Sequence, residues 1–412
     1  MKKVAILHYA SPPTVGGVEE TIAYHARGLA DLGYAVRVVT GRGESFDSRV
    51  ETCVNPLFGS LDARVLKVKS QLDAGQVSSN YHTLLSDVRE GLLAAFDGIN
   101  CCIAHNIATL NKNLPLSAAL ASLAQNQQIK WITWCHDLAW KNPEYLKELH
   151  DGQPWDLLRK VWPNTRYVTV SEDRRGQLAD MLGIGPERIA VILPGVDPAR
   201  FFHWTAETRA LVTRSGLLDA DGLFLLPARL IRRKNVELAL RILAEIRKQS
   251  GRDFRLIVSG PPGPHNPANT GYLQELLALR QKLNLEASVH LLYADGGNET
   301  PLIPDDDMMA NLYQLSDALL FPSIQEGFGI PILEAGLAGI PVFCADIPTL
   351  RASGQADVTY FDPQSEAPED IAMRILKVLN ALPTYRLRVR VRHQYNWQAI
   401  ISKQVVPLLE EQ

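Results

Sequence analysis

The segment Leu319–Leu350 constrains the fold of this chain more than any other stretch. It opens with the apolar run Leu319–Pro322, which predicts a buried strand, and a loop with Gly327 and Gly329 follows. Proline suits the first turn of a helix because its missing N–H has no partner there, so Pro331 predicts that a helix begins near it. A strand, a loop and a helix in this order are the repeating unit of α/β folds.

The same segment carries the chemistry of an anion site. The amides of the loop and of the first helical turn have no backbone partners, and the helix dipole adds to their attraction for an anion. Glu326 lies in the loop and Glu334 one turn into the helix. A phosphate would repel both carboxylates, so we expect them to face neutral hydroxyl groups. This combination suits a sugar nucleotide. In the alternative interpretation the glycines only shape a turn and Glu334 only complements the dipole.

The N-terminus predicts a second α/β unit. Lys3–Tyr9 and Ala35–Thr40 are predicted strands, and the segment between them has helical apolar spacing after the glycine pair Gly16 and Gly17. A glycine loop at the carboxyl end of a parallel strand lies where open α/β sheets bind ligands. The loop lacks the G-x-G-x-x-G pattern, so we expect no nicotinamide cofactor. The alternative is a plain turn before a helix.

Charged and polar side chains follow two further predicted strands. His136 and Asp137 come after Lys130–Trp134, and Arg229 and Lys234 come after the strand that begins at Leu223. An isolated histidine is often a core residue, and a basic run is often a solvated face. The basic run lies at a strand end and a helix start, which favours a ligand site. For His136 this position leaves both interpretations open.

Composition limits the classes of function. The chain has 412 residues, a net charge of −3, 46% hydrophobic and 21% charged residues, and five cysteines without metal spacing. These values predict two globular domains in a reducing, cytoplasmic compartment and argue against general nucleic-acid binding. No apolar run is long enough to cross a membrane, although peripheral contact stays open. In the polar stretch 294–307, Asp305–Asp307 suggest either a metal site or a helix cap, and we favour the cap.

The motif E-G-F-G-I-P-x-L-E-A at residues 326–335 resembles the signature of retaining glycosyltransferases of the GT-B class, family 4. Other segments are similar to motifs of that family. Gly16-Gly17-Val18-Glu19 is similar to its G-G-x-E loop and 194–197 to its N-G-V-D linker, with Pro194 in place of asparagine. Arg229 and Lys234 match its G-R-x-x-x-x-K motif, in which Ala228 replaces glycine.

The resemblance implies an architecture of two Rossmann-like doubly wound domains facing across a cleft. It implies an acceptor-binding domain at 1–195, a sugar-nucleotide domain at 196–385 and a C-terminal helix at 386–412 that crosses back to the first domain. It also implies that His136 contacts the donor hexose and that Glu334 holds the ribose. The implied catalytic residues are Glu326, His136, Arg229 and Lys234, and the implied donor-binding residues are Gly16, Gly17, Arg229, Lys234, Glu326, Gly327, Phe328, Gly329, Ile330 and Glu334.

The implied reaction moves a hexose from a nucleotide-diphosphate sugar to an acceptor hydroxyl with retention of configuration. We expect no metal and no further cofactor, because Arg229 and Lys234 neutralise the leaving diphosphate. The expected partners are the nucleotide sugar and an unidentified acceptor, either a sugar, a lipid-linked molecule or a small molecule. A sugar phosphorylase, a nucleotide-sugar epimerase and a non-catalytic sugar-nucleotide binder are the alternatives.

Overall fold

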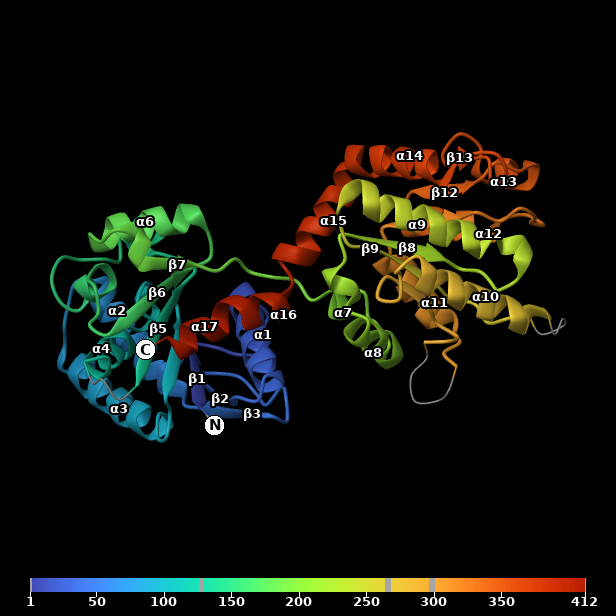
Figure 1. The fold of residues 1–412 in the computed structure, drawn as a ribbon. Coiled ribbons are helices and arrows are strands. Elements are labelled where there is room, and N and C mark those ends of the chain that lie inside the picture. The colour runs from blue at the N-terminus through green and yellow to red at the C-terminus, as the bar shows by residue number, and fades with distance from the viewer. Residues whose placement is uncertain (1, 126–128, 264–267, 296–300, 412) are drawn as a thin grey trace. The chain divides into compact units, whose positions relative to one another are not determined.

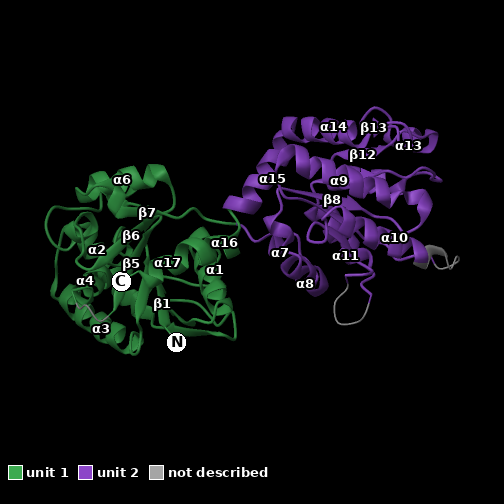
Figure 2. Cartoon of the chain, viewed as in Figure 1, with its two compact units in different colours: residues 1–195, 395–412 green, residues 196–394 purple. Residues whose placement is uncertain are grey.

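The computed structural model describes residues 2–125, 129–263, 268–295 and 301–411. The chain divides into two compact units, of which one comprises Met1–Gly195 with Tyr395–Gln412 and the other Val196–Gln394 (Figure 2). Each unit contains one parallel sheet with helices packed against it (Figure 1). The expected α/β class with two Rossmann-like domains is therefore confirmed, and the chain's end returns to the first unit, as expected.

The sheet of the first unit has the order β3-β2-β1-β4-β5-β6-β7. Chain order reverses between β1 and β4, and ligands of open α/β sheets bind at the carboxyl edge beside such a reversal. The strands are β1 Lys3–His8, β2 Ala35–Thr40, β3 Val50–Val54, β4 Cys101–His105, β5 Lys130–Cys135, β6 Thr165–Thr169 and β7 Ile189–Val191.

Alternating residues of β1 fill two separate cores, one on each face of the first sheet. Val4 and Ile6 pack with α1 and the C-terminal tail, whereas Ala5 and Leu7 pack with α2, α3 and α4. Such a strand, buried on both faces, has a continuous apolar sequence. The helices of this unit are α1 Gly17–Asp31, α2 Ala63–Asp73, α3 Ser79–Ala95, α4 Leu114–Leu123, α5 Pro143–Leu146 and α6 Glu172–Leu182.

The C-terminal tail packs against α1 through α16 (Trp397–Ile400) and a π-helical segment (Ile401–Val405), and α17 (Val406–Glu410) follows this segment. Tyr24 stacks on Trp397 with ring centroids 5.3 Å apart. Gly28 gives the tail room, because a Cβ there would lie 2.3 Å from Cδ1 of Ile401. The return therefore relies on a small residue in α1.

The second unit has a six-stranded sheet in the order β10-β9-β8-β11-β12-β13, with a reversal between β8 and β11. Its strands are β8 Gly222–Leu226, β9 Phe254–Val258, β10 Val289–Leu291, β11 Ala318–Phe321, β12 Val342–Ala345 and β13 Thr359–Phe361. Its helices are α7 Pro198–Phe201, α8 Ala206–Arg214, α9 Val236–Ser250, α10 Ala268–Lys282, α11 Asp306–Leu315, α12 Ile330–Ala338, α13 Pro348–Gly354, α14 Pro368–Ala381 and α15 Pro383–Gln394.

The return to the first unit begins at Tyr395 and not at residue 386, which corrects the expected boundary. The cause is α15, whose side chains are held in the second unit. The hydroxyl of Tyr385 donates to the backbone oxygen of Asp221 at 2.8 Å, and the guanidinium of Arg392 donates to the carboxylate of Asp317 at 2.8 Å. Asp317 and Arg392 are both buried, so this ion pair anchors the helix.

Strand β3 was not expected from the sequence. Its residues, V-E-T-C-V, lie at the edge of the first sheet, and only Val50 is buried. An edge strand of this kind lacks the apolar run that marks a central parallel strand. Within the described ranges, no helix has the length and apolar character needed to cross a membrane.

Candidate functional site

Two loops meet at the reversal of the second sheet, one after β8 (227–235) and one after β11 (322–329). They come together because β8 and β11 are paired strands, with Phe224 opposite Ala318. The amide of Ile324 donates to the backbone oxygen of Arg233 at 2.9 Å and ties one loop to the other. The expected site residues of this unit thus lie in two adjoining loops and at the start of α12, at the edge where such sheets bind ligands.

Lys234 and Glu326 form an ion pair across these loops. Both side chains are largely buried, with 12% and 9% of their surfaces exposed. The ammonium of Lys234 also lies 5.2 Å from the ring centroid of Phe321. Arg233 adds a second cation, since its guanidinium donates to the backbone oxygen of Gln325 at 2.8 Å and lies 3.5 Å from the Glu326 carboxylate. The sequence motifs predict no role for Arg233.

The start of α12 provides the expected unpaired amides. Gly329 is the N-cap, with φ of 94°, a left-handed conformation that favours glycine, and no side chain caps this terminus. A Cβ at Gly329 would also lie 2.5 Å from Cδ2 of Leu350. A Cβ at Gly327 would meet nothing within 4 Å, so the backbone there is open to a ligand. Phe328 and Ile330 beside it are exposed.

Glu334 has a hydrogen-bond partner that no sequence motif predicts. The hydroxyl of Tyr313, a buried residue of α11, donates to Oε2 of Glu334 at 2.5 Å. Burial and this carboxylate raise the pKa of the Tyr313 hydroxyl, which therefore remains a donor. Glu334 itself is exposed. The bond fixes one carboxylate oxygen and leaves the other for a ligand. No motif links two residues 21 positions apart, so only the packing of α11 on α12 reveals the pair.

Arg229 is exposed, and no hydrogen bond or ion pair of its guanidinium occurs within the described ranges. The structure thus joins Lys234, but not Arg229, to Glu326. The backbone around Arg229 is tightly packed, because a Cβ at Gly260 would lie 2.4 Å from the backbone oxygen of Ala228. Its loop is therefore held while its side chain is free to meet a ligand.

In the first unit, His136 follows β5 and lies beside the end of β4. Its Nε2 is 3.0 Å from Nδ1 of His105, the last residue of β4. Asn106 holds the next segment, since its side-chain oxygen accepts from the amides of His136 at 2.7 Å and Asp137 at 3.1 Å. Asn106 also donates to Oδ2 of Asp137 at 3.1 Å. Burial lowers the pKa of His136 to about 4, so the ring is neutral at neutral pH.

The glycine loop of the first unit is shaped by Glu19. Gly16 is the N-cap of α1, and a Cβ at this position would lie 2.2 Å from Oε2 of Glu19. Oε1 of Glu19 lies 3.9 Å from Nε2 of His8, whereas Gly17 is open, with no atom within 4 Å of a Cβ there.

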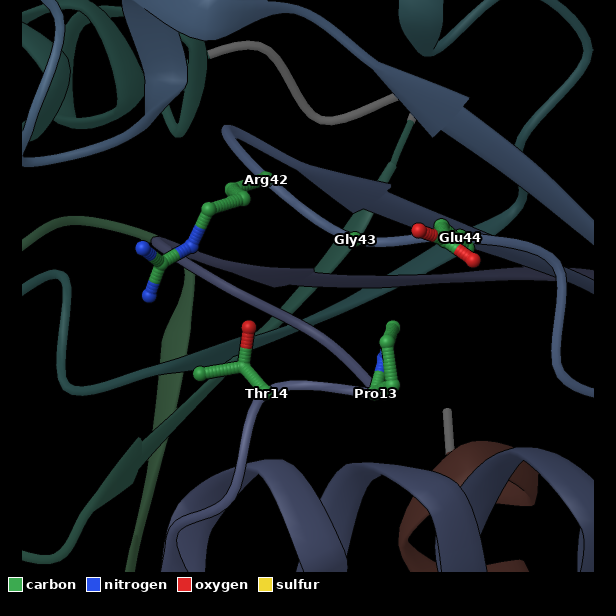
Figure 3. Close-up of a pocket in the computed structure, with 5 residues that line it drawn as sticks. All are labelled: Pro13, Thr14, Arg42, Gly43 and Glu44. Atoms are coloured by element: carbon green, nitrogen blue, oxygen red, sulfur yellow. The ribbon is translucent and has the colours of Figure 1, made fainter.

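Beside this loop lies a hollow of about 390 Å³ (Figure 3). Its lining combines a guanidinium, a hydroxyl and a carboxylate, and it consists of Pro13, Thr14, Arg42, Gly43 and Glu44. The loops after β1 and β2 supply these residues at the carboxyl edge of the first sheet.

Asp305 is the N-cap of α11, because its carboxylate accepts from the amide of Met308 at 2.8 Å. The interpretation of this residue as a cap is confirmed. Residues 296–300 of the preceding polar stretch lie outside the described ranges. Among the residues that are described, no group of three or more histidine, cysteine, aspartate or glutamate side chains is arranged to hold a metal ion.

Comparison with known proteins gives two family matches that together span most of the chain. The family described as Glycosyltransferase Family 4 matches residues 15–200, and the family described as Glycosyl transferases group 1 matches residues 212–390. The chain belongs to these glycosyltransferases, and it is an enzyme of the GT-B class.

Two curated relatives illustrate the range of similarity. Mannosylglucosylglycerate synthase of Petrotoga mobilis is 23% identical over 381 residues, covering 85% of this chain and 83% of that protein. D-inositol 3-phosphate glycosyltransferase of Frankia alni is 33% identical over 195 residues, covering 46% of this chain and 44% of that protein. Among solved structures, sucrose-phosphate synthase of Thermosynechococcus elongatus aligns over 99% of this chain and 98% of its own, with a TM-score of 0.39 and 16% identity.

Proposed function

We propose that this glycosyltransferase moves a hexose from a nucleotide-diphosphate sugar to an acceptor hydroxyl, with retention of configuration and without a metal. The bond between the anomeric carbon and the leaving phosphate oxygen breaks, and a bond from the acceptor oxygen forms on the same face. The acceptor proton passes to the leaving nucleoside diphosphate. No further cofactor takes part.

The observation that carries this proposal is the charge arrangement at the reversal of the second sheet. The open amides at the start of α12 favour an anion, and Lys234 and Arg229 add positive charge from the neighbouring loop. Developing negative charge on the leaving diphosphate is the main electrostatic demand of the step, and preorganised cations meet it. Asp305 is engaged as a helix cap, which supports a metal-independent reaction.

The donor-site roles follow from the positions of the two glutamates. Glu334, fixed by Tyr313 and exposed, is suited to accept from ribose hydroxyls. Glu326 in the glycine loop is suited to the hexose, where positive charge develops at the anomeric carbon. The loop residues Gly327, Phe328, Gly329 and Ile330 offer backbone amides to the phosphates. For the first unit, the proposed roles are a contact of His136 with a hexose and contacts of Gly16 and Gly17 with phosphates.

The names of relatives suggest the acceptor class. One relative is named for D-inositol 3-phosphate and another for mannosylglucosylglycerate. A polyhydroxylated acceptor with an acidic group is therefore our first choice, and the hollow with Arg42 in its lining has a cation for such a group. If the acceptor is lipid-linked, we propose that the enzyme is cytoplasmic and contacts the membrane peripherally.

The test combines ligand screening with turnover. Thermal shift against UDP-, GDP- and ADP-linked hexoses identifies the donor, because a ligand at about 100 times its dissociation constant adds about 2.7 kcal/mol of stability. With that donor, Arg229→Ala and Lys234→Ala should each reduce turnover by about 100-fold. Glu275→Gln is the matched control, since Glu275 forms an exposed ion pair with Arg232. Wild-type turnover in either folded variant, or product formed without an acceptor, would contradict the proposal.

A further inference from the structure

The buried histidines beside His136 point to a role that the proposed function does not assign. His8 ends β1, His105 ends β4 and His136 follows β5, so three neighbouring strands bring them to one edge of the sheet. His25 of α1 lies beneath, with its ring centroid 5.4 Å from that of His105. His8, His25 and His105 are buried, and His136 is half-buried.

We propose that His105 is a positioning residue that holds His136 in the tautomer with its hydrogen on Nδ1, so that His136 meets a sugar as a hydrogen-bond donor. The role of this hydrogen-bond donor in glycosyl transfer rests on the proposed function, whereas the assignment of the tautomer does not. The two ring nitrogens involved, Nδ1 of His105 and Nε2 of His136, are 3.0 Å apart.

Both rings are neutral, so one hydrogen lies in this contact. Burial lowers the pKa of His105 well below its usual range and that of His136 to about 4. The surrounding charges include the Lys112 ammonium and the Asp137 carboxylate, which both affect the pKa of His8, a pKa that burial lowers to about 4. They also include the Glu19 carboxylate, whose Oε1 lies 3.9 Å from Nε2 of His8. A contact between two neutral imidazoles requires one ring to donate and the other to accept.

The surroundings of His105 decide the direction of this bond. Nε2 of His105 is buried and has no hydrogen-bond partner within the described ranges. If His136 donated, the hydrogen of His105 would have to reside on that Nε2, and a buried N–H would have no acceptor. If His105 donates, only a bare nitrogen lone pair is left unpaired. Native proteins avoid the orphaned N–H more strictly than the orphaned acceptor.

His105 is also prevented from reorienting. Its ring stacks on Trp134 with centroids 5.6 Å apart and an interplanar angle of 23°, and its backbone oxygen accepts from Nδ1 of His8 at 2.9 Å. With Nε2 of His136 occupied by the His105 hydrogen, the hydrogen of His136 must lie on Nδ1. No residue within the described ranges hydrogen-bonds to this nitrogen. It is therefore available to donate to a hydroxyl or ring oxygen of a sugar and is unsuited to act as a base.

The first test needs no substrate. A two-bond ¹⁵N–¹H correlation spectrum of the whole chain, labelled with [¹⁵N]histidine and recorded at pH 7.5, distinguishes protonated from bare ring nitrogens. The His136 signals are assigned by their loss in His136→Phe. We expect Nδ1 of His136 to be protonated and Nε2 bare. The reverse assignment, or a ring protonated at both nitrogens, would overturn the proposal, and the wild-type spectrum alone can decide this.

The second test removes the donor. In His105→Phe, which keeps an aromatic ring beside Trp134, the Nδ1–H form of His136 should give way to a mixture of tautomers. His25→Phe is the matched control, since both ring nitrogens of His25 are buried and without partners in the described part of the chain. It should leave the His136 signals unchanged. An unchanged tautomer in His105→Phe would remove His105 from this role.

A binding measurement connects the tautomer to the sugar. UDP-glucose, GDP-mannose and ADP-glucose are each compared calorimetrically with the corresponding nucleoside diphosphate. In His105→Phe we expect the gain in affinity from the hexose to fall about fivefold, while the affinity for the nucleoside diphosphate stays unchanged. In the control His25→Phe, the gain from the hexose and the affinity for the nucleoside diphosphate should both equal those of the wild type. An unchanged gain would overturn the positioning role. Failure of all three sugars to bind would contradict the proposed function, and the spectrum still decides the tautomer.

Discussion

Mild acid should unfold the first unit through its buried histidines. The pKa is lowered by burial to about 4 for His8 and His136, to about 3 for His25, and well below its usual range for His105. An unfolded chain binds protons at these histidines near pH 6.5, whereas the folded chain does not. Between about pH 6 and 4 the unfolded state therefore binds more protons, and stability falls as pH falls.

The size of the effect follows from the number of groups. One pKa unit corresponds to about 1.4 kcal/mol, so each histidine contributes up to about 1.4 kcal/mol per pH unit within this window. Four such groups give up to about 5.5 kcal/mol per pH unit. Because a domain is stable by about 5–15 kcal/mol, the first unit should lose most of its stability within one to three pH units below about 6.

Denaturant unfolding at pH 7.5, 6.5, 5.5 and 5.0, followed by circular dichroism and tryptophan fluorescence, measures this slope. The second unit is an internal control, because His290 is its one described histidine with a lowered pKa, about 4. His25→Phe should reduce the slope of the first unit by about a quarter. A slope that stays flat between pH 6 and 5, or one that is equal in the two units, would refute the argument.

Four other outcomes are expected. Glu326→Gln should lower kcat by about 100-fold. In calorimetry its affinity for the nucleoside diphosphate should be unchanged or up to about tenfold tighter, because the Glu326 carboxylate competes with the phosphates for Lys234. A tenfold weaker affinity would reverse the roles of the two glutamates. Tyr313→Phe should weaken nucleoside diphosphate binding about three- to tenfold without changing kcat, because Glu334 loses one hydrogen bond; unchanged affinity would remove Glu334 from the ribose. Asp317→Ala should lower the free energy of unfolding of the second unit by about 3–5 kcal/mol in denaturant titration, because the buried Arg392 charge loses its carboxylate partner. A loss below about 1 kcal/mol would show that the ion pair does not anchor α15. Transfer should persist in excess chelator, and activity restored only by magnesium or manganese would contradict the metal-independent step.

The sequence predicts the central parts of this fold well, for a physical reason. A parallel strand between two helical layers needs an apolar side chain at every position, and β1 and β11 are such runs in the sequence and are buried strands in the structure. The helix predicted to begin near Pro331 begins at Ile330, one residue before the proline. Edge strand β3 escaped detection because one face of it is open to solvent.

The candidate site was less predictable, because its contacts join residues far apart in the chain. The positions of Lys234 and Glu326 follow from their motifs, but their ion pair depends on the pairing of β8 with β11. Tyr313 and His105 carry no motif at all. Only the structure shows their contacts with predicted site residues. The hydroxyl of Tyr313 contacts Glu334, and a ring nitrogen of His105 contacts His136. Local sequence indicates which residues meet a ligand and does not indicate what holds them.

The two units hold their polar groups by different physical means, and this difference follows from what each surrounds. In the second unit, Lys234 and Glu326 are charged and largely shielded from water, and each supplies the counter-charge that the other lacks without a ligand. A diphosphate can replace the carboxylate as the partner of the lysine, so the pair keeps the cation in place at little cost in stability. In the first unit, His105 and His136 are neutral and share one hydrogen. Neutral donors suit uncharged hydroxyl groups, which offer no charge to offset the burial of an ion.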